Sequence, residues 1–302
     1  MKILITGASG LIGKNLIKKM LDRGYSINFF TTQKNKINSI KNCNGFYWNP
    51  SRGNIDLKAF EGVSQLIHLA GASISKPWTK YYKNKIIDSR VLSSQIIYNS
   101  LVDINYRLDG IVSASAIGGY LSSNEKIYKE SDPLSSKTFL GKVVSKWERS
   151  VDELEIHSER LTKFRIGLVL SGKGGFLSKL ITLIKFGLGS AFGDGNQWQS
   201  WIHIDDLCEL IIYSIEKNYQ GTYNAVSNNP LTQNSLIKKI GKEINRPIFF
   251  PNIPGFVLKL FLGERSQLIM DSHKVSSDKI IKSGFKFKYN HFEDAIKNLK
   301  LN

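Results

Sequence analysis

The fold of this chain is decided by its first thirteen residues, which read MKILITGASGLIG (1–13). The apolar run before Gly7 predicts a buried strand, and Gly7, Gly10 and Gly13 follow it at three-residue spacing. Apolar residues then recur at helical spacing up to Gly24. A strand, a glycine turn and a helix in this order are typical of the first βαβ unit of a dinucleotide-binding domain.

Each of the three glycines has a physical role in such a unit. Gly7 lets the chain turn sharply off the strand, and Gly10 lets a pyrophosphate approach the backbone because it has no Cβ atom. Gly13 lets the helix pack closely on the sheet, and the helix N-terminus presents unpaired N–H groups to the phosphates. The residues that we expect to hold the cofactor here are Gly7, Ser9, Gly10, Leu11, Ile12 and Gly13.

The end of the second predicted strand, 27–31, indicates which dinucleotide binds. Sites that prefer NAD usually carry an Asp or Glu about 20 residues after the glycines, where it holds the ribose 2′-hydroxyl. Here the chain reads Thr31-Thr32-Gln33-Lys34, so no carboxylate would repel a 2′-phosphate. Thr31 and Thr32 offer hydrogen bonds and Lys34 offers positive charge, which favours NADP. The alternative is that Lys34 is a solvated loop residue.

A further predicted strand delivers small residues to the same edge of the sheet. The strand over 63–69 ends in Leu69-Ala70-Gly71, a turn that leaves space for a ligand. His68 in this strand is interpreted as a packed residue rather than a catalytic one. Arg90, in a helix predicted over 78–101, is a candidate contact to the cofactor, with a surface charge as the alternative.

The alternation of strands and helices over about the first 165 residues predicts an α/β fold, a doubly wound parallel sheet. We expect a dinucleotide-binding domain over 1–170, to which a strand near 221–227 returns. A smaller substrate-binding region would consist of 171–220 and 228–302. Single strands are expected over 164–170 and, at an edge, over 284–288.

Composition limits the classes of partner. The net charge of +17 arises from 42 Lys and Arg against 25 Asp and Glu, but the basic residues are dispersed, so we expect no specific nucleic-acid partner. No apolar run approaches the ~20 residues that span a bilayer, and we expect no membrane partner. Two cysteines suggest neither a disulfide framework nor a metal site, and the first strand leaves no room for a signal peptide, so a cytoplasmic location is expected.

With these motifs in view, the chain resembles the extended short-chain dehydrogenase/reductase superfamily. More narrowly, it resembles the atypical family of nucleoside-diphosphate-sugar epimerase-like proteins, and the resemblance covers nearly the whole chain. It implies a Rossmann-type fold. The residues that carry it are Thr6-Gly7-x-x-Gly10-x-x-Gly13, Leu69-Ala70-Gly71, Trp78-Thr79, Ser89-Arg90, Ser115, Lys146-Trp147-Glu148, Gly187-Leu188-Gly189, Gly193-x-Gly195-x-Gln197, Trp201-Ile202-His203-Ile204-Asp205-Asp206, Gly263-Glu264 and Gly284-Phe285.

The resemblance implies a Ser that orients the substrate, a Tyr that exchanges the proton, and a Lys one helical turn after the Tyr. Ser115 matches the Ser, but Leu140 and Val144 occupy the Tyr and Lys positions, and neither can move a proton. Leu140 is then expected to line the cofactor. If the chain is catalytic, Tyr120 and His203 are the candidate replacements.

His203 is attractive because its pKa lies near working pH, with a structural hydrogen-bond anchor as the alternative. Gln197 and Arg165 are weaker candidates for the substrate side. Two functions stay open: an NADP-dependent oxidoreductase or epimerase-like enzyme, and a non-catalytic NADP-binding sensor or assembly protein. The expected partner is a small-molecule substrate, with a sugar nucleotide as one class, and a homo-oligomer is a further option.

Overall fold

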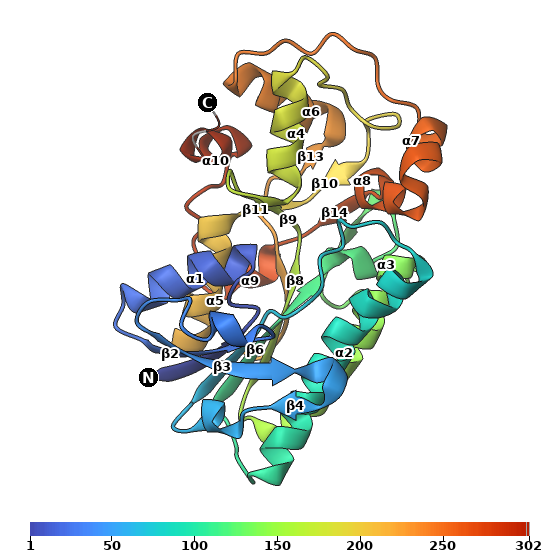
Figure 1. Ribbon diagram of the computed structural model, residues 1–302. Helices are drawn as coiled ribbons and strands as arrows, with labels where there is room; N and C mark the ends of the chain where they lie inside the picture. The colour runs from blue at the N-terminus through green and yellow to red at the C-terminus, as the bar shows by residue number, and fades with distance from the viewer. Residues whose placement is uncertain (300, 302) are drawn as a thin grey trace. The chain divides into compact units, whose positions relative to one another are not determined.

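The computed structural model describes residues 1–299 and 301, and the chain divides into two compact units (Figure 1). Unit 1 comprises Met1–Ser115, Lys142–Arg165 and Cys208–Tyr223. Unit 2 comprises Ala116–Gly141, Ile166–Leu207 and Asn224–Asn302. This division differs from the expected ranges, which placed 116–141 with the first region and 208–220 with the second.

Unit 1 is built on an eight-stranded sheet. Its strands are β1 (Lys2–Thr6), β2 (Ser26–Thr31), β3 (Cys43–Asn49), β4 (Asn54–Ile55), β5 (Gln65–His68), β6 (Gly110–Ala116), β8 (Leu161–Ile166) and β12 (Gly221–Ala225). The spatial order is β12-β8-β6-β5-β1-β2-β3-β4. β1 pairs in parallel with β2 and β5, and β6 with β5, whereas the short β4 is antiparallel to β3. This confirms the predicted α/β fold with a doubly wound, parallel-dominated sheet.

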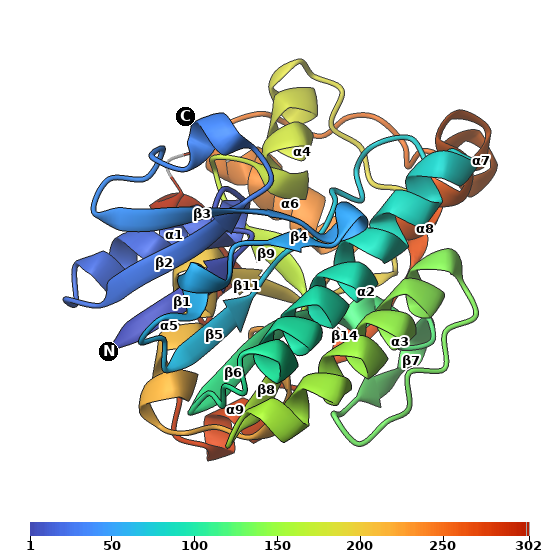
Figure 2. The ribbon, with the colours of Figure 1, turned by 60° about the horizontal axis from the view of Figure 1, so that its bottom comes forward.

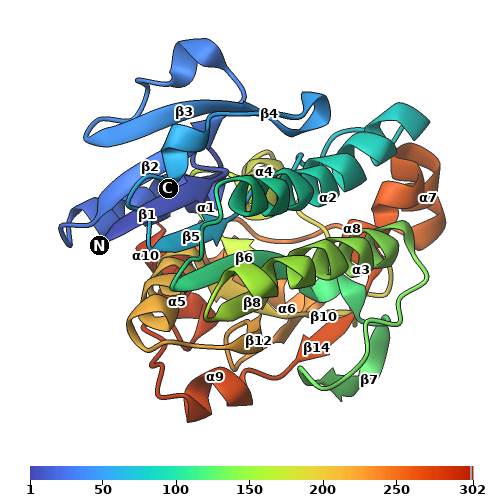
Figure 3. The same ribbon diagram turned by 90° about the horizontal axis from the view of Figure 1, so that it is seen from below.

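Helices cover both faces of this sheet because its central strands are apolar on both sides. Ile3, Leu4 and Ile5 of β1 are fully buried. Figures 2 and 3 show α2 and α3 side by side on one face, and α1 and α5 on the other. The helices are α1 (Leu11–Leu21), α2 (Lys80–Asp103), α3 (Phe139–Asp152) and α5 (Ile204–Glu216).

Contacts of α5 with α1 and the turn that follows it explain why residues from Cys208 onward belong to unit 1. Glu209 accepts hydrogen bonds from Lys19 (3.2 Å) and Arg23 (2.5 Å). Glu216 accepts a third from the hydroxyl of Tyr25 at 2.9 Å. The C-terminal part of α5 is therefore one of the helices that cover the parallel sheet.

Unit 2 contains a four-stranded sheet in the order β13-β10-β14-β7 and a β11-β9 pair. A core that includes Trp201 and Phe292, packed edge to face, joins α4, α6 and α10 (Figure 1). The elements are β7 (Ser123–Tyr128), β9 (Leu168–Leu170), β10 (Trp198–Gln199), β11 (Trp201–His203), β13 (Leu231–Thr232), β14 (His273–Val275), α4 (Gly175–Lys185), α6 (Gln233–Glu243), α7 (Gly255–Leu262), α8 (Gln267–Met270), α9 (Asp278–Lys282) and α10 (Phe292–Asn298). None of the helices described over 1–299 and 301 is both long and apolar enough to cross a membrane.

Two predicted strands were wrong in detail. The run 164–170 is divided at Gly167 into β8 and β9, and a Cβ atom at Gly167 would lie 2.3 Å from the carbonyl oxygen of Ser200. The segment 284–288 forms no strand, and the N–H of Lys288 binds the carboxylate of Asp206. β7 and β14, which pair with each other, were not predicted.

Candidate functional site

The turn from β1 into α1 is so tight that Gly7 in the turn and Gly13 in α1 leave no room for a side chain. Gly7 has φ of +72°, and a Cβ atom there would lie 2.6 Å from the carbonyl oxygen of Leu69. A Cβ atom on Gly13 would lie 2.4 Å from the oxygen of Gly7. The first turn of α1 has neither an acidic residue nor a capping side chain within the described structure. Its N–H groups, which begin at Leu11 and Ile12, therefore suit an anionic ligand such as a pyrophosphate.

Thr6 joins the ends of β1 and β5. Its Oγ1 accepts hydrogen bonds from the N–H groups of Leu69 (3.0 Å) and Ala70 (3.1 Å), and it donates its proton to Nδ1 of His68 at 2.8 Å. Nε2 of His68 faces the hydroxyls of Ser93 and Ser94 on α2. The Leu69-Ala70-Gly71 turn is thus fixed beside the glycine loop.

His68 is held as a neutral ring. Burial, and to a smaller extent the charge of Arg90, lower the pKa of His68 to about 4. Because both ring nitrogens are engaged inside the protein, His68 connects β5 to α2 and is not available to a substrate. This agrees with its interpretation as a packed residue.

Arg90 is a partly buried cation beside Gly71. A Cβ atom at Gly71 would lie 3.0 Å from the Arg90 guanidinium, which donates to carbonyl oxygens of Ala72 and Ile86 and lies 5.0 Å from the ring centroid of Trp147. Burial lowers the pKa of Arg90 to about 10. Among the described residues its Nε has no hydrogen-bond partner and no carboxylate pairs with it. A cation in this state favours an anionic ligand.

The end of β2 carries polar side chains and no acid. Thr31 Oγ1 accepts a hydrogen bond from the N–H of Gln33 at 3.2 Å, and Thr32 is exposed. The exposed Lys34 places its ammonium 5.2 Å from the ring centroid of Tyr47. The structure thus leaves Thr32 and Lys34 accessible, as a 2′-phosphate site requires.

Ser115, near the carboxyl end of β6, belongs to a buried polar cluster that we call the Ser–Glu–Arg cluster (Ser115, Glu148 and Arg165). Ser115 Oγ donates to Glu148 Oε1 at 2.5 Å. Arg165 on β8 donates to both carboxylate oxygens of Glu148, from Nε at 2.9 Å and from Nη2 at 3.0 Å. All three side chains are less than 10% exposed, at 3%, 6% and 7%. The Ser115 proton is therefore committed to Glu148, and its lone pairs are left to accept.

Glu148 is ionised in this arrangement. Burial acts to raise its pKa, but the hydrogen bonds and charge of Arg165, together with the Ser115 hydroxyl, hold the pKa of Glu148 below its usual range. Sequence reasoning did not select Glu148, and it placed Arg165 on the substrate side. The sequence does contain a signal that could have identified Glu148. Leu140, Val144 and Glu148 follow one another at four-residue spacing, so they lie on one face of α3.

Leu140 and Val144 on α3 both carry apolar side chains, and neither can move a proton. Leu140 lies half-buried in the first turn and Val144 is buried. The first polar side chain on this face of the helix is that of Glu148, one turn further on.

Tyr120, in unit 2, does not fit the role of proton donor. Its side chain is fully buried and stacks on Tyr128, with ring centroids 4.9 Å apart. Its hydroxyl donates to Oδ1 of Asn224 at 2.8 Å, within reach also of the carbonyl of Lys129. An interior hydroxyl with these partners is closed to a substrate in this structure, so the geometry does not favour the predicted catalytic role of Tyr120.

His203, also in unit 2, is 1% exposed and acts as an anchor in this structure. Its Nδ1 accepts the N–H of Asp205 at 3.1 Å, and its ring lies 4.0 Å from that of Tyr289. Asp206 accepts the N–H groups of Lys288 and Tyr289, both at 2.9 Å. These contacts tie the start of α5 to the 287–290 segment and favour the structural alternative for His203.

Two other polar side chains of unit 2, those of Gln197 and Asp271, are buried or half-buried. Gln197 is buried, and its Nε2 donates to the carbonyls of Phe192 (2.9 Å) and Ile269 (3.0 Å), so it holds loops together. Asp271, which sequence reasoning missed, is half-buried at the end of α8, and burial raises its pKa to about 6.

Comparisons with known proteins cover nearly the whole chain. The model of the NAD dependent epimerase/dehydratase family matches residues 3–226, and a domain of unknown function (DUF1731) matches 253–299. The epimerase family protein SDR39U1 homolog of Arabidopsis thaliana, named as chloroplastic, is 32% identical over 98% of this chain and 86% of its own length. The expected cytoplasmic location therefore stays a prediction.

Solved structures are similar over the whole chain. Human epimerase family protein SDR39U1, crystallised with NADPH, has a TM-score of 0.86 at 22% identity and covers 100% of both chains. The nucleoside-diphosphate sugar epimerase from Corynebacterium glutamicum has a TM-score of 0.79 at 26% identity and covers 99% of this chain and 58% of that one. The family match and the relatives confirm the resemblance seen in the motifs: this chain belongs to the NAD dependent epimerase/dehydratase family.

Proposed function

We propose that unit 1 binds NADP at the carboxyl ends of its strands. The glycine loop and the bare N-terminus of α1 would hold the pyrophosphate. Thr32 and Lys34 would face the 2′-phosphate, and Arg90 would supply a positive charge to the ligand. The human relative, whose structure contains NADPH, supports the same choice of nucleotide.

We further propose that the chain is an NADP-dependent oxidoreductase with epimerase-like chemistry, and the Ser–Glu–Arg cluster is the observation that carries this proposal. Bound NADP supplies the acceptor or donor of a hydride at a substrate carbon. Ser115 can only accept a hydrogen bond from a substrate, because its own proton is held by Glu148 at 2.5 Å. A substrate hydroxyl therefore fits Ser115 better than a carbonyl does.

The cluster provides a route for the proton that leaves such a hydroxyl. As the carbon gives up its hydride, the hydroxyl proton passes to Ser115 Oγ while the Ser115 proton passes to Glu148. Arg165 keeps Glu148 in the deprotonated form that can accept, and the reverse transfer serves reduction of a carbonyl. Glu148 would thus stand in for the missing Tyr, with Ser115 in contact with the substrate.

A sugar nucleotide is the substrate class that we propose. Such substrates carry several hydroxyl groups and a diphosphate, and the net charge of +17 favours anionic ligands in general. The Corynebacterium glutamicum relative is named as a nucleoside-diphosphate sugar epimerase, which supports the same class.

One observation favours a second candidate, a non-catalytic NADP-binding protein. The Arg165 pair lowers the pKa of Glu148, which makes it a weak base, and Leu140 and Val144 remove the usual pair. A protein that only senses the cofactor would keep the glycine loop and have no need of a proton route.

The two candidates are separated by Ser115→Ala, with Ser113→Ala as the matched control on the same strand. Ser113 is also buried, but its hydroxyl donates to the backbone carbonyl of Ala114. For an enzyme, Ser115→Ala should lower NADPH formation from a panel of sugar nucleotides by about 100-fold or more, because a positioned proton acceptor contributes that much. NADP affinity should not change in either variant.

Mass spectrometry of the nucleotide that co-purifies tests the cofactor separately. NAD in place of NADP would contradict the interpretation of 31–34. If wild-type protein binds NADP but turns over no carbonyl compound or sugar nucleotide, the sensor alternative stands and the proposed chemistry fails.

A further inference from the structure

Unit 2 exposes an unusual set of large apolar side chains, which we call the aromatic ridge. Single exposed apolar residues are ordinary, but here each member is more than half exposed. Five of the six lie in α7 and the segment that leads into it. The ridge consists of Phe186 (77% exposed), Phe249 (83%), Phe250 (56%), Phe256 (74%), Leu260 (79%) and Phe261 (76%).

Hydrogen bonds join the chain after Phe186 to the chain between Phe250 and Phe256. Ile253 donates its N–H to the carbonyl of Ala191 at 2.8 Å, and Gly193 donates to the carbonyl of Ile253 at 2.9 Å. Ser190 Oγ also donates to the carbonyl of Pro251 at 2.5 Å. α7, which follows directly, buries Leu258 and turns Phe256, Leu260 and Phe261 outward.

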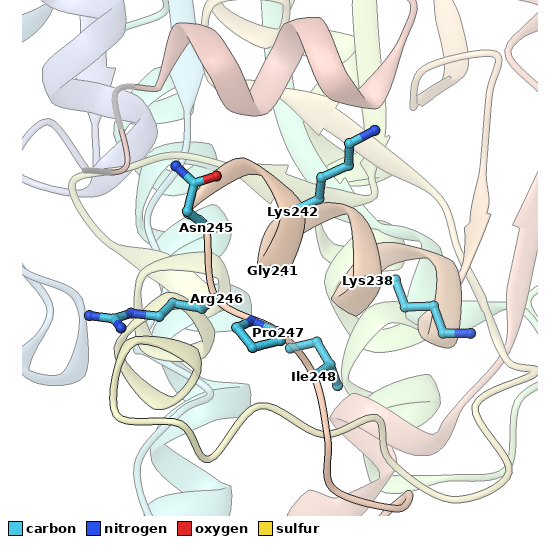
Figure 4. A pocket seen from close by; sticks show the side chains of 7 residues that line it. All are labelled: Lys238, Gly241, Lys242, Asn245, Arg246, Pro247 and Ile248. Carbon is cyan, nitrogen blue, oxygen red and sulfur yellow. The ribbon is translucent and has the colours of Figure 1, made fainter.

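Positive charge borders the ridge. A recess of about 380 Å³ lies between α6 and the segment that leads to Phe249, and Lys238, Lys242 and Arg246 stand at its rim. Figure 4 shows these three side chains projecting in different directions around Gly241 and Pro247. All three are exposed. Over 238–265 the chain has six Lys or Arg against two Glu.

We propose that the aromatic ridge docks on an anionic membrane surface. Exposed Phe and Leu side chains that are flanked by Lys and Arg are the composition of segments that lie in a bilayer interface. A second copy of this chain fits less well, because a two-fold contact would place the same cations opposite one another. This differs from the expectation of no membrane partner, which rested on the lack of a spanning segment, and surface docking needs none.

The test is co-sedimentation of the full chain with vesicles of pure phosphatidylcholine or of equal parts phosphatidylcholine and phosphatidylglycerol. We expect binding to the anionic vesicles only, weakened by salt. Lys238→Gln/Lys242→Gln/Arg246→Gln should reduce the affinity by about 100-fold, since each adsorbed cation contributes about fivefold. Phe256→Ser/Phe261→Ser should reduce it by at least about tenfold.

The matched control is Lys36→Gln/Lys41→Gln/Lys58→Gln, three exposed lysines of unit 1, which lowers the net charge equally. It should bind as wild type does, and circular dichroism should show all variants folded. Equal loss in the control and the rim variant would mean that charge alone attracts the protein, and would overturn the proposal. So would absence of binding to anionic vesicles, or a dimer in solution that Phe256→Ser/Phe261→Ser dissociates. None of these outcomes depends on NADP or on turnover.

Discussion

Acidification should destabilise this protein in part through the buried ring of His68. His68 is fully buried, accepts the Thr6 proton at Nδ1 and has a folded-state pKa of about 4 against 6.5 for the free side chain. Because the unfolded chain binds this proton more tightly, the stability that the neutral ring contributes is complete above pH 6.5. It is lost as the pH falls from 6.5 towards 4.

The magnitude follows from the two pKa values. Between pH 7.5 and pH 5.0 the unfolded state gains about 2 kcal/mol over the folded state from this group alone, and the full loss below pH 4 is about 3 kcal/mol. Asp271 acts in the opposite direction, because its folded pKa is raised to about 6 and protonation relieves the buried carboxylate. The His68 contribution must therefore be isolated by comparison with a variant.

His68→Gln removes the titration and keeps an amide that can reach the hydroxyls of Ser93 and Ser94. Urea unfolding followed by tryptophan fluorescence at pH 7.5 and 5.0 gives the free energy of unfolding of both proteins. The variant should lose about 2 kcal/mol less than wild type over this interval. Equal pH dependence in the two proteins would refute the reasoning, since it would mean that His68 is protonated in the folded state or not buried there.

Three further changes have definite expected results. Gly13→Ala, whose Cβ atom would meet the Gly7 oxygen at 2.4 Å, should cost about 1–3 kcal/mol in urea unfolding and weaken NADP binding, whereas Gly118→Ala, with open space around it, should do neither. Thr32→Asp should shift the ratio of NADP to NAD affinity, measured by calorimetry, by at least about tenfold towards NAD, because the carboxylate repels a 2′-phosphate. Asp271→Asn should raise the urea midpoint at pH 8 but have little effect at pH 5, where the wild-type carboxyl is already mostly protonated. A larger effect at pH 5 than at pH 8 would contradict a raised pKa of Asp271.

The sequence was sufficient for the part of the fold that local patterns determine. Glycine is required at position 13 because of the nearby Gly7 and Ala8, and at position 7 because of the neighbouring Leu69 turn. The strand and the helix around them follow from the spacing of apolar residues. The resemblance to the family was confirmed for the same reason, since its motifs are short and lie at strand ends. The sites themselves stay proposals.

What could not be predicted depends on contacts between distant residues. Gly167 interrupts a strand because of the Ser200 carbonyl, which no local pattern reveals. Tyr120 lies four residues after the end of β6, but Asn224, which accepts its hydrogen bond, is 104 residues away in the sequence. β7 is short and largely exposed, so it lacks the alternating pattern that identifies a strand.

The burial of the Ser–Glu–Arg cluster bears on whether the cluster serves stability or chemistry. Burying Glu148 and Arg165 removes two charges from water, and such a pair is often no more stable than apolar residues of the same volume. Stability alone therefore gives no reason for the pair, although the Ser115 hydroxyl gives the buried Glu148 a third hydrogen bond beside the two from Arg165. The hydroxyl of Ser115 helps to keep Glu148 ionised, and we propose that its oxygen also contacts a substrate. If the cluster were only structural, Ser115→Ala would be as harmless as Ser113→Ala, and the difference between these two variants is where the proposed chemistry succeeds or fails.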